Sequence, residues 1–533
     1  MVSILKGKQF YLISHGNIGL YFAGFILALV TLSCSIGVSQ PTGPFFTPPS
    51  NNVIMLTPTL EPAQQTQEPL PVAEDLGNSE DDPALTPTPE VTETSRPPLL
   101  YYAQAGDTLP VIAIRFGVEA SEIISPDPIP ATTLLNPNQL LIIPNRLANT
   151  TNHEKILPDS ELVDSPSAVD FDIKAFVAGA GGYLSTYKEW LGTTNWTTGA
   201  EIVQRVAVEN SINPRILLAL LEYQSGWVYG QPANLALTDY PMGVFGSNNK
   251  GLYQQLAWAV NQLSIGYYGW REGLLTEIQF SDGVTARLAP ELNAGTVALQ
   301  YYLAQIYDTA GWVKALDVSQ GLPALYEKMF GSPWMRAYEV EPLYPPDLTQ
   351  PRLVLPFFFG QVWSYTGGPH GAWEHDGSRA AVDFAPAADR SGCYESNTWV
   401  LASAPGLVVR SDNGVVILDL DGDGVEQTGW VLLYLHIAEE DRIGAGQWVE
   451  TGDLLGHPSC AGGLASGNHV HMARKYNGEW ISADGPLPFV LSGWVVHAGA
   501  KPYQGTLTQD GETVTASTVG SYESRIIRNR NEP

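Results

Sequence analysis

The spacing of apolar residues in this 533-residue chain changes near residue 351, and this change constrains the fold more than any other feature. Between 170 and 345, apolar residues recur at three-and-four spacing, as in "NPRILLALLEYQSGW", which predicts an all-α domain. From 351 to 500, β-branched and aromatic runs such as "GWVLLYLHI" alternate with turns rich in Gly, Asp and Asn, which predicts an antiparallel β-rich domain. Because the chain exceeds the length of one ordinary domain, we expect a multidomain α+β protein.

Residues 99–146 read as a third, small folded unit. A strand over 100–104 leads into a "GDTL" turn, where Asp107 or Thr108 is placed to cap the helix "LPVIAIRFG". A closing strand, "QLLIIP", follows. Through "GDTL", "RFGV" and the final "IP", the unit resembles a LysM domain, a βααβ module that binds N-acetylglucosamine-containing glycans. The resemblance implies a glycan-binding module, with Gly106, Asp107 and Thr108 as candidate contacts.

Three other stretches have compositions that do not build a core. Residues 35–98 are rich in Pro, Thr and acidic residues, which predicts an extended linker. The polar and acidic stretch 147–169 predicts a second linker. We expect residues 501–533 to form a tail.

The N-terminal segment 1–34 has the pattern of an export signal. Lys6 and Lys8 precede an apolar run over 18–32, which ends at a Ser followed by Cys34. Three interpretations are open: a lipoprotein signal with a lipid on Cys34, a retained membrane anchor, or a cleaved secretory signal. Each of them places the rest of the chain outside the cytoplasm, and the first two make the membrane a partner.

Charge and cysteine content fit an exported protein. The 55 acidic residues against 27 basic ones give a formal net charge of -28, which argues against a nucleic-acid partner. Besides Cys34, the chain has Cys393 and Cys460. In an oxidising compartment these two could form a disulfide, and two free thiols are the alternative.

The stretch "SINPRILLALLEYQSGWV" resembles the helix that carries the catalytic Glu in lysozyme-like transglycosylases and glucosaminidases. The aligned position here is Gln224, whose amide cannot donate a proton as a carboxylic acid does. Glu222 lies about 200° round the helix and so faces elsewhere. The helical domain is therefore either a lysozyme-like fold without its usual chemistry, or a glycosidase that uses Glu222 or another Glu.

The β-rich region holds two histidines one residue apart, His469 and His471. Residues two apart on a strand share a face, as two ligands of one metal must. A hydrolytic zinc site needs three protein ligands and one open position for water. The stretch "YTGGPHGAWEHDGSRAAVDFAP" adds His370 and then Asp383, which lies in the alternating strand 381–385.

This combination resembles the lysostaphin-type zinc endopeptidases. In the lysostaphin branch a His lies four residues before the Asp, where this chain has Arg379. In the β-lytic branch a "G-x-H" loop precedes the Asp by about a dozen residues, and "GPH", ending thirteen residues before Asp383, fits. The resemblance implies that His370, Asp383 and His471 bind one zinc ion, with His375 as the rival first ligand.

The resemblance also assigns roles to His469 and to His436, which lies in "LLYLHI". Both would lie over the metal without binding it, orient the attacking water, take its proton and stabilise the oxyanion. Neither His457 nor His497 matches a position of the family, so we interpret both as structural. Asp419, Asp421 and Asp423 match the start of a calcium loop, but the twelfth position is Trp430, which favours a hairpin turn.

We therefore expect an exported peptidoglycan hydrolase, a zinc metalloendopeptidase that a LysM module directs to the cell wall. Two rival functions remain at this stage. One is a glycan-cleaving enzyme that acts through the helical domain. The other is a non-catalytic protein that binds the wall and regulates other hydrolases.

Overall fold

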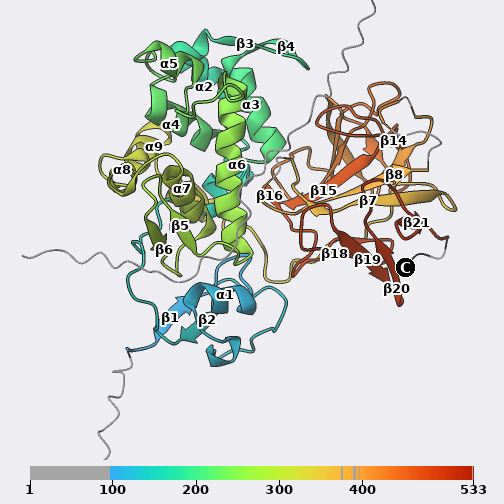
Figure 1. Ribbon diagram of the computed structural model, residues 1–533, viewed down its shortest axis with the longest axis horizontal. Coiled ribbons are helices and arrows are strands. Elements are labelled where there is room, and N and C mark those ends of the chain that lie inside the picture. Colours follow the sequence, from blue (N-terminus) through green and yellow to red (C-terminus); the bar gives the residue numbers. More distant parts are fainter. Residues whose placement is uncertain (1–95, 374–375, 388–391, 395, 531, 533) are drawn as a thin grey trace, which may run out of the picture. The chain divides into compact units, whose positions relative to one another are not determined.

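Three groups of elements follow one another along the chain, a small mixed unit, a helical region and a β-rich region (Figure 1). The computed structural model describes residues 96–373, 376–387, 392–394, 396–530 and 532. The predictions for segment 1–34 with Cys34, for nearly all of the 35–98 linker and for His375 lie outside these residues. Among the helices described, none is both long and apolar enough to cross a bilayer.

The small unit pairs its two strands antiparallel around one helix, as the sequence predicts. The helix ends at Gly117, which adopts the left-handed conformation with φ 64°. The expected βααβ order includes a second helix, and this part of the prediction is wrong. Ala120–Glu122 instead forms a single 3-10 turn, with a capping box between Glu119 and Glu122. The elements are β1 (Leu99–Tyr102), α1 (Leu109–Phe116), η1 (Ala120–Glu122) and β2 (Leu140–Ile143).

Two of the three candidate glycan contacts of this unit, Asp107 and Thr108, are buried, and Gly106 is half-buried. The buried Asp107 carboxylate accepts hydrogen bonds from the Tyr101 hydroxyl at 2.6 Å and the Arg115 guanidinium at 2.8 Å. Thr108 is buried at the N-cap of α1 without a side-chain capping bond. A side chain at Gly106 would lie 2.7 Å from the Arg271 guanidinium. The predicted side-chain cap is therefore wrong, whereas glycan contact through these residues stays a prediction.

The helical region carries the predicted helices, but it is not all-α. Two antiparallel hairpins interrupt it, because "KEWLGTTNWTT" and the stretch 277–287 alternate about short polar turns. The hairpins are β3 (Lys188–Leu191) with β4 (Asn195–Thr198) and β5 (Glu277–Gln279) with β6 (Thr285–Arg287). The helices are η4 (Tyr183–Ser185), α2 (Ile173–Ala180), α3 (Gly199–Asn210), α4 (Pro214–Ser225), α5 (Leu235–Asp239), α6 (Leu252–Arg271), α7 (Ala294–Ala304), α8 (Thr309–Ala315), α9 (Leu322–Phe330) and α10 (Pro333–Val340).

The expected linker 147–169 belongs to the helical region instead. Leu162 and Val163 are fully buried in the helical core, because the polar stretch still carries enough apolar residues to pack there. Glu161 accepts hydrogen bonds from Arg336 of α10. The two short turns of this stretch are η2 (Asp159–Glu161) and η3 (Pro166–Ala168).

The β-rich region is antiparallel throughout, which confirms the prediction for this part of the chain. Its main sheet has the order β13-β10-β11-β12-β15-β8-β7-β21, and β11 and β12 form the hairpin predicted at "DLDGDG". The strands up to residue 491 are β7 (Val362–His370), β8 (Ala381–Pro386), β9 (Val400–Leu401), β10 (Gly406–Asp412), β11 (Val415–Asp419), β12 (Trp430–Leu435), β13 (Trp448–Val449), β14 (Leu454–Gly456), β15 (Val470–Tyr476), β16 (Glu479–Trp480) and β17 (Val490–Leu491).

The expected tail 501–533 is wrong, because its alternating apolar residues complete two sheets. Leu507 and Val514 are buried in a four-stranded sheet, and Ile526 is buried at the edge of the main sheet, where β21 pairs with β7. The strands concerned are β18 (Trp494–Ala498), β19 (Gly505–Gln509), β20 (Glu512–Thr515) and β21 (Arg525–Ile527).

Both faces of the main sheet are buried, so strand alternation sends side chains into two separate cores. Leu433 and Ala473 join the core of the helical region, whereas Val470 and Met472 join the core of the β-rich region. Because residues two apart share a face, His471 lies on the face of Ala473, the face that the helical region covers.

A buried ion network joins the two regions. The Arg271 guanidinium of α6 lies 2.9 Å from Asp159 and 3.1 Å from Glu479 of β16. The Tyr267 hydroxyl donates to the same Glu479 at 2.9 Å. Breaking one member of such a network leaves an uncompensated buried charge, which costs about 3–5 kcal/mol, so the network holds the two regions together.

One carboxyl at this boundary makes stability depend on pH. Burial raises the pKa of Asp164 from 3.8 to about 7, despite attraction to Lys475. In the unfolded chain the carboxyl ionises as the pH rises past about 4, while the folded chain keeps the proton until about 7. Folding stability is therefore lost across this window. We expect Asp164→Asn, which keeps an acceptor for Gln427, to raise the melting midpoint by at least about 2 °C at pH 8 and by less at pH 5.

The matched control is Asp170→Asn, since Asp170 is exposed. Its melting midpoint, measured by calorimetry, should follow the wild type at both pH values. An Asp164→Asn variant with the same pH dependence as the wild type would contradict this account of the buried carboxyl.

Candidate metal centre

Strand pairing brings the predicted ligands together. His471 of β15 lies directly opposite Asp383 of β8, and His370 ends β7, the next strand in the sheet. Gly367 faces Asp383 from β7, and a side chain there would lie 2.3 Å from the carboxylate. Only a glycine at position 367 therefore leaves space for the Asp383 carboxylate.

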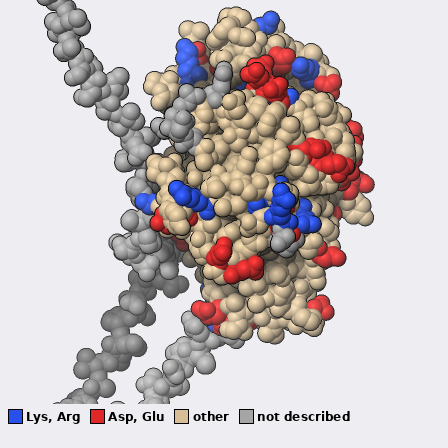
Figure 2. Space-filling view, turned by 90° about the vertical axis from the view of Figure 1, so that its right-hand side faces the viewer, with Lys and Arg blue, Asp and Glu red and all other residues tan. Residues whose placement is uncertain are grey.

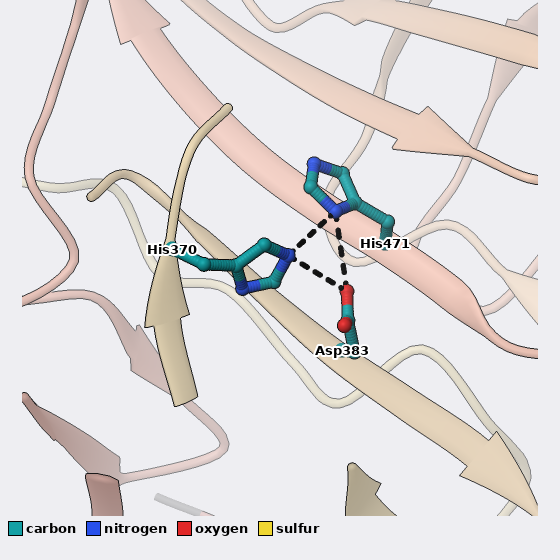
Figure 3. A group of neighbouring side chains, drawn as sticks. All are labelled: His370, Asp383 and His471. Carbon is teal, nitrogen blue, oxygen red and sulfur yellow. Dashed lines mark hydrogen bonds and ion pairs between the residues drawn. The ribbon is translucent and has the colours of Figure 1, made fainter. Parts of the chain in front are cut away.

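Three ligand atoms converge on one point (Figure 3). His370 Nε2 lies 3.0 Å from His471 Nδ1 and 3.3 Å from Asp383 Oδ1. His471 Nδ1 lies 3.2 Å from the same oxygen. All three residues are buried. The sequence-predicted ligand set is thus one cluster in the folded chain.

Backbone carbonyls fix which ring nitrogens carry hydrogen. His370 Nδ1 lies 2.8 Å from the Gly368 carbonyl oxygen, and His471 Nε2 lies 2.9 Å from that of Ala372. Because a carbonyl only accepts hydrogen bonds, these nitrogens must be the N–H donors. The other nitrogen of each ring therefore presents a bare lone pair to the cluster, which is the arrangement of metal-binding histidines.

The cluster fits a zinc ion. Asp383 Oδ1 has no hydrogen-bond donor although it is buried, because both imidazoles turn lone pairs toward it. Two lone pairs and a carboxylate oxygen repel one another unless a cation lies between them. Tetrahedral zinc with bonds of ~2.0–2.1 Å sets neighbouring ligands roughly 3.3 Å apart, close to the separations of this cluster.

The electrostatics of the cluster favour the ligand forms. Burial acts to raise the pKa of Asp383, but the neighbouring His370 and His469 hold it well below its usual range. Burial lowers the pKa of His471. These directions favour an anionic Asp383 and a neutral His471, the forms that bind zinc. Burial acts to lower the pKa of His370, but the Asp383 carboxylate raises it above its usual value, so a metal ion must displace a proton from that ring.

His436 and His469 stand beside the cluster, as predicted. Their ring centroids are 4.4 Å apart, and His469 Nε2 lies 3.8 Å from Asp383 Oδ1. Each ring donates its Nδ1–H to a carbonyl 2.8 Å away, which leaves each Nε2 as a bare acceptor. Burial, with repulsion from His469 and His471, lowers the pKa of His436 to about 3, so its ring is neutral.

His436 follows β12 in a left-handed conformation, with φ 68°. Ser459 holds this turn, since its backbone N–H and its hydroxyl both donate to the His436 carbonyl. The disulfide between Cys393 and Cys460 links the neighbouring loops. Asn468 adds a second link, because its side-chain amide oxygen Oδ1 accepts a hydrogen bond from the backbone N–H of Tyr394 at 3.1 Å.

The cluster opens into a cleft of 1490 Å³, larger than the roughly 300–1,000 Å³ of small-molecule pockets. Several contributors to its lining were not predicted. Tyr503 stacks on His370 with ring centroids 4.1 Å apart, and the segment 518–522 forms part of the wall. Helix α6 adds Gln254 and Ala257. No local sequence motif marks these positions, because only the tertiary fold brings them to the site.

The two candidate residues on the lysozyme-like helix, α4, are hydrogen-bonded within the helical region. Glu222 accepts hydrogen bonds from the backbone N–H groups of Val228 and Tyr229, so its carboxylate closes the turn after α4. Gln224 accepts a hydrogen bond from the Tyr307 hydroxyl at 2.9 Å. Both side chains thus have structural partners.

Sequence comparisons support a family for this chain. Residues 155–345 match the family "LasA, N-terminal domain". Two sequences named Protease LasA, from two strains of Pseudomonas aeruginosa, are each 26% identical, over 355 and 353 residues. Both matches cover 62% of this chain and 75% of the relative.

Two solved structures of peptidases are similar to part of this chain. "A Novel M23 Metalloprotease Pseudoalterin from Deep-sea" is 23% identical, with a TM-score of 0.27, and covers 32% of this chain and 96% of its own. The catalytic domain of the antimicrobial peptidase lysostaphin from Staphylococcus simulans is 21% identical, with a TM-score of 0.16. This match covers 23% of the present chain and 87% of the lysostaphin domain.

The LasA-type M23 metallopeptidases, which are LytM- and lysostaphin-like, are the family that these sequence matches support. The family match over the helical region is to a LasA N-terminal domain, and it begins at residue 155, inside the stretch expected to be a linker. The lysozyme-like character of this region and the LysM character of 99–146 stay predictions.

Removing one ligand tests the metal centre. We expect His471→Ala to weaken zinc binding by at least about 100-fold, because the two remaining ligands cannot close the site. Zinc content after dialysis, measured by plasma mass spectrometry, checks this. His497→Ala is the control, since His497 bonds Thr508 outside the cleft and should retain its zinc. Equal zinc in both variants would contradict the assignment.

Proposed function

We propose that this chain is an exported zinc endopeptidase that cleaves peptide stems or cross-bridges of peptidoglycan. The observation that carries the proposal is the convergence of His370, Asp383 and His471 with their bare ligand atoms, beside two further histidines in an open cleft. The names of the relatives, Protease LasA and M23 metalloprotease, support peptidase activity. Peptidoglycan as substrate rests on the resemblance to the lysostaphin-type enzymes.

In this proposal His370, Asp383 and His471 hold one zinc ion. When bound, the ion supplies a Lewis acid that polarises the scissile carbonyl and lowers the pKa of a bound water. His436 and His469 orient the attacking water with their bare Nε2 atoms. One of them takes its proton as the C–O bond forms and returns it to the leaving amine as the C–N bond breaks. The protonated ring meanwhile donates a hydrogen bond to the developing oxyanion.

Glycan cleavage through the helical region is the weaker candidate. Glu222 already accepts two backbone hydrogen bonds, which makes it a structural carboxylate, and Gln224 has no acid to offer. A purely regulatory role is also weaker, because family members of that kind lack zinc ligands, whereas His370, Asp383 and His471 lie together here as a group that could hold a metal ion.

The location of the enzyme is proposed from the N-terminal sequence. An export signal or anchor over 1–34, with a lipid on Cys34 as one form of it, would place the folded regions in the cell envelope outside the cytoplasm.

The face drawn in Figure 2 carries basic and acidic side chains in separate small groups among uncharged ones, with no continuous basic surface for a nucleic acid on that face.

The catalytic pair gives a direct test. We expect His469→Ala to keep its zinc but to cleave purified peptidoglycan at least about 100-fold more slowly, because it removes a proton acceptor and not a ligand. The measurement is the appearance of new amino termini, with zinc content determined in parallel.

His457→Ala is the matched control, a histidine of the same region that does not line the cleft and should keep wild-type activity. New reducing or anhydro sugar ends in place of amino termini would support the glycan-cleaving rival. A zinc-free wild-type chain with unchanged activity would contradict the proposal.

A further inference from the structure

Helix α6 of the helical region presents one continuous stripe to the β-rich region. Positions 254, 257, 261, 264 and 268 recur at three-and-four spacing and so lie on one face of the helix. The stripe covers 14 residue steps from 254 to 268, about 21 Å along the helix axis at ~1.5 Å per residue.

The C-terminal end of the stripe is fixed to the sheet. The Tyr268 hydroxyl accepts a hydrogen bond from the backbone N–H of Trp480 at 3.0 Å. Within the same last turns of α6, Tyr267 and Arg271 hold Glu479 of β16. These contacts are buried, so α6 has a defined place against β16 and the end of β15 that pairs with it, opposite to the end of β15 that carries His471.

The middle of the stripe contacts the connection between β7 and β8, which carries the site's supporting carbonyl. Asn261 and Asp376 exchange two hydrogen bonds of 3.3 Å, one to the Asp376 side chain and one from its backbone N–H. A side chain at Gly377 would meet Ser264 at 2.8 Å. The same connection holds Ala372, whose carbonyl orients His471.

The N-terminal end of the stripe lines the cleft of the candidate metal centre. Gln254, which is exposed, and Ala257 line the same cleft as His370, Asp383 and His471. Neighbouring Tyr253 is held from behind, since its hydroxyl donates to Glu209 at 3.0 Å and Arg205 stacks on its ring. The cleft keeps its 1490 Å³ with α6 in place, so the helix walls the site without filling it.

We propose that α6 is a substrate-binding wall of the peptidase, and that Gln254 and Ala257 contact the peptide on the side opposite the sheet. The helical region would then determine which peptides enter. This inference rests on the proposed peptidase function. Of the described side chains that line the cleft, Asp383 and Arg525 alone are charged besides the histidines, and Gln254 and Ala257 of α6 are both uncharged, so an uncharged stretch of peptide matches the wall.

Narrowing the cleft from α6 tests the inference in the full chain. The probe is a set of soluble cross-linked peptides released from peptidoglycan by a muramidase, and the readout is the rate of new amino groups. We expect Gln254→Trp and Ala257→Trp each to raise KM about tenfold with kcat within about threefold, because they obstruct binding and leave the reacting groups untouched. Zinc content should stay at the wild-type value.

Two matched controls carry the same changes elsewhere on the helical region. Gln305→Trp and Ala310→Trp alter exposed residues that do not line the cleft, and both should keep KM within about twofold of the wild type. Because Gln254 is itself exposed, its variant should fold even if Ala257→Trp does not.

The outcomes separate the two proposals. An active wild-type chain whose α6 variants keep wild-type KM would overturn the wall alone. Faster cleavage by either variant would also overturn it, since it would make α6 a cover that restrains the enzyme. A wild-type chain that releases no amino groups would overturn the proposed function and the wall with it.

Discussion

The pairing of β15 with β8 is the contact on which the site depends. It sets His471 opposite Asp383, and the next pairing, of β8 with β7, brings His370 to the same point. Strand alternation then sends Val470 into one core while His469 and His471 face the other side. A shift of one residue in this register would exchange the faces and bury the histidines where Val470 packs.

The supporting carbonyls complete what the register begins. Gly368 and Ala372 each hold one ring N–H, so both ligands meet the cluster with a lone pair rather than a proton. The cost is a buried carboxylate oxygen without a donor, which a cation relieves. Carbonyl contacts of the same kind leave His436 and His469 beside the cluster with a bare Nε2 each, which the proposed proton transfer requires.

The sequence predicted the parts of this arrangement that depend on local pattern. The helix-to-strand change near 351, the His-x-His spacing and the "GPH" motif thirteen residues before Asp383 are all properties of neighbouring residues. What it missed depends on long-range packing. The 147–169 and 501–533 stretches are polar on average, yet residues such as Leu162, Val163 and Leu507 are buried in the two cores. Tyr503 stacks on His370 across 133 positions, and no spacing rule reaches that far.

The part of the helical region that lines the cleft is not the part that the sequence singled out. The resemblance to a lysozyme-like helix predicts a functional position at Glu222 or Gln224, but both side chains are hydrogen-bonded to other parts of the helical region. The part that faces the cleft is α6, whose sequence carries aromatic and glutamine residues that look like ordinary core and surface. Because one buried core and the Arg271 network join the two regions, the helical region is built around the face of the sheet that carries the site.

X-ray absorption at the zinc edge, on the zinc-loaded full chain, tests the central claim most directly. The account predicts a four-coordinate first shell with two imidazole nitrogens, one carboxylate oxygen and one further oxygen, all at ~2.0–2.2 Å. A shell that contains sulfur, or one made of oxygen atoms without imidazole, would contradict it.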